Sequence, residues 1–366
     1  MRNHVARVLG VLVLYGSLVA WLTWPLAASL RTHLPFTEGQ CAFDTLYSAW
    51  ALSWESHALV TDPRRIAEAN IYAPTPHALF YGPTAFGALP YFAPIFLATG
   101  DPALAVNLLF LGGVALTAAS LHLVVGAWTA TQVAGLVAGS TFLTARWVLW
   151  DFIPTTPHFA VLHYLPWIVF VTATPTLGRR AALALLVLVV LQYLVEPIYV
   201  APAVMAPLGC LMLARVARRA TRGDGLRLAG VLVVAGLAIA PVLAGYWAVR
   251  VENPSLGAQT LWRVAQTPTA LPWEPLGRFS PTSVQPIALM LISIGAASFA
   301  LSARRASAMQ RRLWTHAALW TVAGLAISLT PTATWYGRPI ALPHALLARW
   351  LPISGVIRVP GSLSRP

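Results

Sequence analysis

The acidic residues of this 366-residue chain gather in one segment, 31–83, which lies between two long apolar stretches. The segment holds five of the chain's eleven acids, which are Glu38, Asp44, Glu55, Asp62 and Glu68. A carboxylate can take a proton from a hydroxyl group as a general base, or it can bind a divalent cation. Asp44 is the strongest candidate because it follows the first apolar stretch closely, which places it near a membrane surface. For Glu38, Asp62 and Glu68 the alternative is a solvated surface position.

Residues 42–60 are predicted to form an amphipathic helix that lies in the membrane interface. Its aromatic and apolar face carries Phe43, Leu46, Trp50 and Trp54, and its opposite, polar face carries Asp44, Ser48, Ala51 and Glu55. Asp44 and Glu55 are eleven residues apart, or about 16 Å along a helix. Because a two-carboxylate glycosidase site needs a separation of roughly 5–10 Å, these acids cannot form such a pair. A catalytic Asp44 therefore works alone or with groups from other loops.

Further polar residues near the predicted outer surface are candidate substrate- or phosphate-binding residues that would act beside Asp44. In the acidic segment they are Glu55, His57, Asn70 and His77, and in later loops they are Arg146, Asp151, His158 and Glu196. An arginine at headgroup level can bind a lipid phosphate through two hydrogen bonds, although an ion pair between Arg146 and Asp151 is the alternative. Glu196 precedes Pro197, so a turn-capping role competes with a functional one.

The composition excludes an ordinary soluble domain. Hydrophobic residues make up 58% of the chain and charged residues 10%, and the mean hydropathy is +0.69. All 24 basic residues are arginines that cluster in short runs between apolar stretches. That placement orients membrane spans and argues against a nucleic-acid partner. The sequence contains no HExxH, CxxC, P-loop or glycine-rich dinucleotide motif, so chemistry on soluble nucleotides has no support.

The hydropathy pattern predicts an all-α, polytopic membrane protein with one domain over 1–366 and about nine transmembrane helices. The expected spans are 7–29, 103–126, 132–149, 159–175, 181–196, 198–214, 226–248, 284–302 and 313–330. Segment 84–99 is short and contains Pro90 and Pro94, which favours a re-entrant or interfacial position. Gly135 and Gly139 form a GxxxG pattern that favours close helix packing. The tail 331–366 has no closing helix, which is typical of a C-terminally truncated fragment.

The arginines predict the orientation of the chain. If the N-terminus is cytoplasmic, thirteen arginines and one acid, Asp224, face the cytoplasm, while ten acids and eleven arginines face the other side. The segments 31–83, 150–158 and 249–283 and the tail then lie on the extracytoplasmic side. The acidic segment is therefore expected to face outward.

Several stretches resemble the bacterial membrane proteins related to the GT-C glycosyltransferases. The resemblance is carried by 44–50 (DTLYSAW), 54–57 (WESH), 69–81 (ANIYAPTPHALFY), 99–107 (TGDPALAVN) and 351–360 (LPISGVIRVP). It covers the N-terminal third best and extends more weakly through Arg146 and His158. Two departures stand out: Gly361 and Ser362 follow the last motif where relatives carry another arginine, and Gly82 and Pro83 follow Tyr81 where many relatives carry an acid.

The resemblance implies a glycosyltransferase of the bacterial inner membrane that moves a sugar from a polyprenyl-phosphate donor to a glycan, lipid or protein acceptor of the cell envelope. It implies that Asp44 is the general base or positions the acceptor and a divalent cation. Arg146 and His158 would then meet the donor phosphate. Two other functions stay open, a non-enzymatic transporter or lipid flippase and a degenerate assembly subunit.

Overall fold

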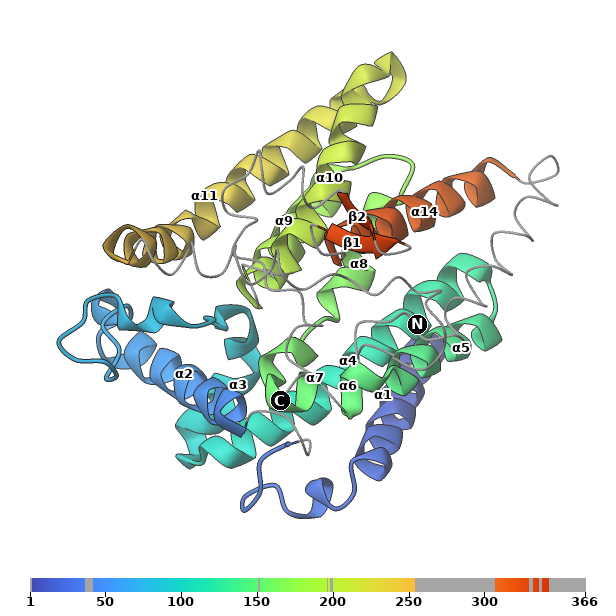
Figure 1. The fold of residues 1–366 in the computed structure, drawn as a ribbon. Coiled ribbons are helices and arrows are strands. Elements are labelled where there is room, and N and C mark those ends of the chain that lie inside the picture. Colours follow the sequence, from blue (N-terminus) through green and yellow to red (C-terminus); the bar gives the residue numbers. More distant parts are fainter. Residues whose placement is uncertain are drawn as a thin grey trace. The chain divides into compact units, whose positions relative to one another are not determined.

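The computed structural model describes residues 2–36, 42–150, 152–195, 197, 200–253, 307–328, 332–335 and 338–341. Helices dominate these residues (Figure 1). The α-helices are α1 (Arg2–Leu22), α2 (Ala42–Thr61), α3 (Leu89–Thr99), α4 (Pro102–Thr129), α5 (Gln132–Thr144), α6 (Arg146–Leu149), α7 (Phe152–Thr155), α8 (Tyr164–Thr172), α9 (Arg179–Val195), α10 (Val200–Ala217), α11 (Arg222–Glu252) and α14 (Ala308–Ser328). Short 3-10 turns are η1 (Leu26–Ala28), η2 (Pro63–Arg65), η3 (Ala78–Tyr81), η4 (Phe86–Ala88), η5 (Pro157–Ala160) and η6 (Arg219–Thr221).

The chain divides into two compact units. The first comprises 1–201 and 215–249, and the second comprises 202–214 and 250–366. In the second unit the described residues include α14 and a hairpin of two antiparallel strands, β1 (Thr332–Trp335) and β2 (Arg338–Ala341). The prediction of a helical protein is thus confirmed for the main elements, while the hairpin was not predicted.

Helix α4 is the central element of the first unit. The Oδ1 atom of Asp101 caps its start by accepting a hydrogen bond from the N–H of Leu104 at 2.9 Å, and Pro102 occupies the first turn. One apolar cluster joins α4 to α1, α5 and η5, and another joins it to α2, α3 and α9. Phe110 belongs to the first cluster and its neighbour Leu109 to the second, so α4 separates two parts of the core.

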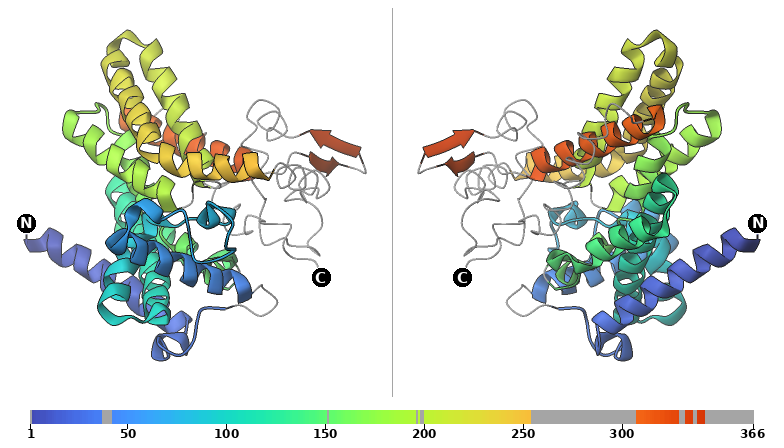
Figure 2. Two further views of the ribbon diagram at one scale, coloured as in Figure 1. Left: turned by 90° about the vertical axis from the view of Figure 1, so that its left-hand side faces the viewer. Right: turned by 90° about the vertical axis from the view of Figure 1, so that its right-hand side faces the viewer.

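Small residues let the helices around α4 approach closely. Gly135 lies against His122 of α4, and Gly139 lies against Tyr15 of α1, at positions where any Cβ atom would collide. The interpretation of the GxxxG pattern as a packing motif is therefore confirmed. The first half of α1 extends away from this packing in both views of Figure 2, and Val5, Leu9 and Val13 are more than half exposed.

Fewer spans are present among the described residues than the nine predicted. Three helices are long and apolar enough to cross a membrane, Val5–Leu22, Pro102–Thr129 and Arg219–Glu252. A fourth is reached if the pair Gln132–Thr144 and Trp147–Thr155, bent by 61°, is one span. The predicted span 159–175 is divided between η5 and the nine-residue α8, and the span 284–302 lies outside the described residues. A hydropathy profile averages over many residues, so it does not show a break in the helix such as the one between η5 and α8. The apolar helices indicate a membrane protein.

Candidate functional site

Helix α2 packs through its small and polar side chains. Its buried residues are Thr45, Ser48, Ala49, Ala51, Leu52, Glu55, Ser56 and Ala58. Glu55, which was expected on the polar face of an interfacial helix as a candidate site residue, is instead buried, with an exposed fraction of 0%. Short side chains on this face let α2 approach α3 and η4, and Leu52 joins the same apolar cluster as Phe92 and Ala88.

The opposite face of α2 divides into two parts. Phe43 and Leu46 in the first turns are 60% and 56% exposed, as an interfacial helix requires. Trp50 and Trp54 are instead half-buried under the segment that follows α2. The indole N–H of Trp50 donates to Asn70 Oδ1 at 2.9 Å, and that of Trp54 donates to the Ile66 carbonyl at 2.9 Å. Only the N-terminal half of the aromatic face is therefore well exposed.

Glu55 is a buried carboxyl group that holds a neighbouring turn. Its Oε1 atom accepts a hydrogen bond from the backbone N–H of Ala85 at 3.0 Å. Among the described residues its Oε2 atom has no hydrogen-bond partner. Burial raises the pKa of Glu55 to about 8, and the bond from Ala85 offsets part of that rise. Near neutral pH the group is therefore largely protonated, which suits a positioning role.

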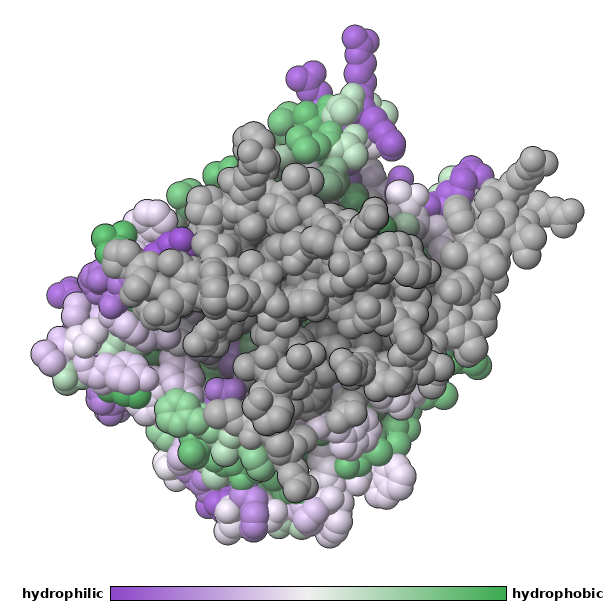
Figure 3. Space-filling view, viewed as in Figure 1, coloured by the Kyte–Doolittle hydropathy of each residue, from purple (hydrophilic) through white to green (hydrophobic). Residues whose placement is uncertain are grey.

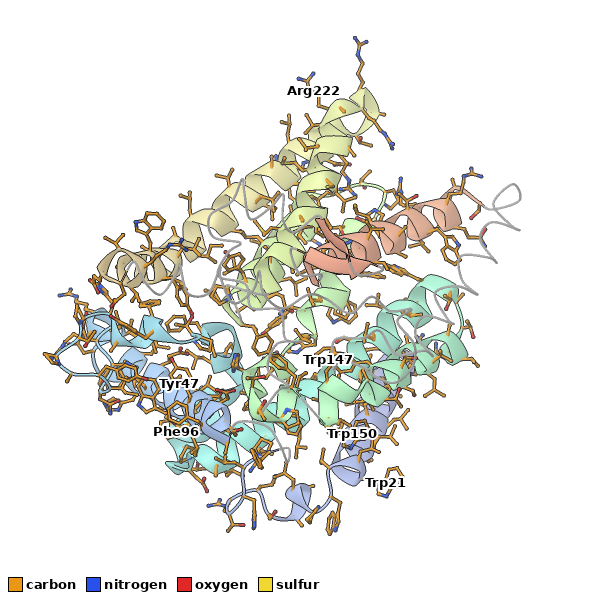
Figure 4. All side chains as sticks on the ribbon, in the orientation of Figure 1. Trp21, Tyr47, Phe96, Trp147, Trp150 and Arg222 are labelled. Carbon is orange, nitrogen blue, oxygen red and sulfur yellow. The ribbon has the colours of Figure 1, made fainter. Side chains whose placement is uncertain are left out.

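Tyr47 (Figure 4) lies eight residues, or about two helical turns, before Glu55 and closes the same contact between α2 and the 78–88 segment. Its hydroxyl donates to the carbonyl of Leu79 at 3.5 Å, and its ring end lies directly against Gly82. Burial, followed by the charge of Glu55, raises the pKa of Tyr47, so the phenol stays protonated. A side chain at position 82 would displace this ring, which explains a glycine there.

Asp44 stands at the exposed end of the same helix. It occupies the first turn of α2 and is half-exposed, and a helix N-terminus stabilises a negative charge. The turn is fixed by its buried neighbour Thr45, whose hydroxyl lies 3.2 Å from the Pro35 carbonyl and 3.3 Å from the Thr155 carbonyl. The structure thus brings the start of α2 to the 152–160 segment, where sequence analysis expects partners of Asp44.

His158 reaches α2 from that segment but is enclosed. Its exposed fraction is 1%, and its Nδ1 atom lies 3.4 Å from the hydroxyl of Ser48. Burial lowers the pKa of His158 to about 3, so the imidazole is neutral at physiological pH. A buried, neutral imidazole is poorly suited to bind a donor phosphate. Its geometry instead supports a role in holding α2 in place.

The other predicted site residues of the acidic segment lie apart from Asp44. His57 is exposed, and its ring centroid is 6.3 Å from that of Trp54. Asn70 is committed to the indole of Trp50. His77 has a left-handed backbone with φ 55°, and its N–H donates to Glu68 Oε2 at 3.3 Å. Asn70 and His77 thus help to fix the segment between α2 and η3.

Several predicted residues lie outside the described part of the structure. They are Glu38, Asp151, Glu196 and the side chain of Arg146. Within the described ranges no group of three His, Cys, Asp or Glu side chains could hold a metal ion.

Sequence analysis missed Tyr246 of α11, which holds the 82–84 turn from the other side. Its hydroxyl oxygen accepts a hydrogen bond from the N–H of Thr84 at 2.8 Å and lies 3.2 Å from the Gly82 carbonyl. The adjacent Gly245 lies against the ring of Phe80. A tyrosine next to a glycine late in an apolar helix was the available signal, but the contact joins residues 162 positions apart.

Comparison of this chain with protein-family models, with characterised proteins and with solved structures finds no match in any of the three.

Proposed function

We propose that the chain is a membrane glycosyltransferase that moves a sugar from a polyprenyl-phosphate donor to an acceptor in the cell envelope. The observation that carries this proposal is the setting of Asp44. Its half-exposed carboxylate stands between Phe43 and Leu46, two apolar side chains that are more than half exposed. A base beside a lipid-facing surface suits a reaction between a lipid-linked donor and a hydroxyl group at the membrane surface.

In the proposed reaction the Asp44 carboxylate takes the proton of an acceptor hydroxyl. The hydroxyl oxygen attacks the anomeric carbon of the sugar and forms the new glycosidic bond. The bond between that carbon and the phosphate oxygen breaks at the same time, and its electron pair leaves with the polyprenyl phosphate. A phosphate leaves without a protonating acid, so one carboxylate is enough. The configuration at the anomeric carbon inverts.

The packing of α2 supports this role by fixing the base. Thr45 and Ser48 tie the first turns of the helix to the 152–160 segment, and Glu55 ties its centre to the turn at Ala85. The start of the helix is thereby held while its outward surface stays accessible. Arg146 remains the proposed ligand of the donor phosphate because an arginine matches phosphate geometry.

The test is transfer of a radiolabelled sugar from polyprenyl phosphate in proteoliposomes that contain the full chain. The proposal expects a labelled glycoside of inverted anomeric configuration, with one polyprenyl phosphate released for each sugar transferred. Label that crosses the bilayer with the donor's sugar–phosphate bond intact would support a flippase instead. A complete panel of donors and acceptors without any transfer, in protein that folds, would contradict the proposal.

A further inference from the structure

A cluster of arginines lies at the end of α11 opposite the acidic segment. The exposed members, called here the basic surface, are Arg179, Arg180, Arg218, Arg219, Arg222 and Arg227. They come from the start of α9, from η6 and from the first turns of α11. Figure 4 shows Arg222 pointing outward from the start of α11, and Figure 3 shows hydrophilic side chains gathered at this place with apolar ones beside them.

Two partly buried hydrogen bonds assemble the basic surface from two separate turns. The guanidinium group of Arg227 donates to the Leu177 carbonyl at 3.1 Å, just before α9. The guanidinium group of Arg215 donates to the Thr172 carbonyl at 2.6 Å, at the end of α8. The turns 172–180 and 215–227 are therefore fixed to each other, so the arginines that they carry form one surface.

The charge of this surface is nearly uncompensated within these turns. Asp224 is the only acid in 172–180 and 215–227, and it is buried and bound to Arg227 at 2.9 Å. The other five arginines have no acid in either turn. Such a density of guanidinium groups matches ligands with phosphate groups.

Apolar side chains follow the arginines along the same helix faces. On α9, Leu183 and Val187 stand four and eight residues after Arg179 and are 64% and 50% exposed. On α11, Leu226, Val233 and Leu237 repeat the pattern after Arg222, at helical spacing and with more than half of each side chain exposed. A ligand that matches both parts has a phosphate headgroup and acyl chains.

The length of α11 places this surface away from the proposed reaction site. Tyr246 contacts Gly82 of the acidic segment, and Arg222 lies 24 residues earlier on the same helix. The path between them along α11 is about 36 Å, which is an upper bound on their separation because Pro241 bends the helix (Figure 2). From these observations we propose that the basic surface binds anionic phospholipids of the leaflet opposite the acidic segment.

The proposal does not depend on the proposed transferase activity, and its test measures thermal unfolding of the full chain in a neutral detergent. Phosphatidylglycerol is added at a series of mole fractions, with phosphatidylcholine as the zwitterionic control. The unfolding temperature is expected to rise with phosphatidylglycerol and to change little with phosphatidylcholine. The triple variant R218Q/R219Q/R222Q is expected to lose at least half of that rise.

The matched control variant is R64Q/R65Q, because these two arginines are exposed but lie on η2 in the acidic segment. It should keep the full rise with phosphatidylglycerol. Equal rises in wild type and in the triple variant, or equal rises with the two lipids, would overturn the proposal. Soluble glycerophosphate at the same concentration distinguishes a lipid headgroup from a soluble phosphate ligand. If it raised the unfolding temperature as much as phosphatidylglycerol does, the surface would be assigned to a soluble ligand instead.

Discussion

The carboxyl group of Glu55 and the backbone N–H of Ala85 form a buried hydrogen bond of 3.0 Å that joins the middle of α2 to the turn before α3. The bond fixes α2 to the core through a group that is costly to ionise in this place. The Tyr47 hydroxyl of α2 donates to the Leu79 carbonyl, and the Tyr246 hydroxyl of α11 donates to the Gly82 carbonyl. The acidic segment is therefore an anchored part of the first unit.

The first prediction concerns pH and Glu55. Burial raises the pKa of the Glu55 carboxyl in the folded state to about 8, from its ordinary value of 4.5. Between these values the folded chain binds a proton that the unfolded chain has released, so stability falls as pH rises through this window. Below about pH 4.5 the carboxyl is protonated in both states, and Glu55 contributes its full stabilisation of the fold. The thermal unfolding temperature of wild type relative to Glu55→Gln should therefore fall from about pH 5 to about pH 8 and then level off.

Glu55→Gln is the informative variant because its amide oxygen can still accept the N–H of Ala85 while the group no longer titrates. A wild-type curve parallel to that of Glu55→Gln at every pH would contradict the prediction. In contrast, Glu55→Ala removes both the titrating group and the hydrogen bond. It is expected to destabilise the fold by about 1–3 kcal/mol, because the N–H of Ala85 is left unpaired.

The second prediction concerns acid and His158. Burial lowers the pKa of this imidazole to about 3, from 6.5, so the unfolded chain binds a proton between these values and the folded chain does not. The contribution of His158 to the free energy of unfolding is therefore fully present above about pH 6.5 and is lost as the pH falls toward about 3. Unfolding temperatures of wild type and His158→Gln, measured from neutral to acidic pH, should converge on acidification. The exposed His57→Gln on α2 is the control, and a difference between wild type and His158→Gln that stays constant with pH would exclude the mechanism.

The third prediction uses two adjacent glycines of α4. A Cβ atom at Gly113 would lie 2.8 Å from the Cβ of Ala160, whereas one at Gly112 would meet nothing within 4 Å. Gly113→Ala is expected to destabilise the fold by about 1–3 kcal/mol through overpacking against η5. Gly112→Ala should be neutral or stabilising by up to about 1 kcal/mol because alanine favours a helix. Chemical denaturation in detergent measures both, and equal effects would show that α4 and η5 do not approach in this way.

The fourth prediction concerns the contact between α11 and the acidic segment. Tyr246→Phe removes the acceptor of the buried N–H of Thr84, which should destabilise the fold by about 1–3 kcal/mol. Tyr72→Phe is the matched control, because the Tyr72 side chain is 52% exposed and surface substitutions change stability little. Equal unfolding free energies for the two variants would argue against the contact.

Sequence patterns predict the class of this fold better than its contacts. Hydropathy identifies α1, α4 and α11, because long apolar helices without breaks carry their own signal. It does not predict the division of 159–175, since η5 and α8 are separated by tertiary packing against α4. The burial of Glu55 was not predicted, because helical phasing distinguishes the two faces of α2 without showing which one meets the core. Here small side chains such as Ala51 and Ser48, rather than Phe43 and Leu46, form the buried side.

The candidate site shows the same limit. The position of Asp44 at the start of a helix after the first apolar stretch is predictable from local sequence. The contacts of Thr45 with Thr155 and of Ser48 with His158 join residues 110 positions apart, and no local pattern encodes them. His158 was expected to bind phosphate, but its burial makes it a neutral packing residue.

The most direct test of the central claim compares sugar transfer by Asp44→Asn and by Asp62→Asn in proteoliposomes, with equal amounts of folded protein and a labelled polyprenyl-phosphate sugar. Asp62 is an exposed acid that directly follows α2, so its variant controls for loss of negative charge in the same segment. Loss of a general base is expected to lower kcat for Asp44→Asn by about 10²-fold or more, while Asp62→Asn keeps the wild-type rate. Transfer by Asp44→Asn at the wild-type rate would contradict the account.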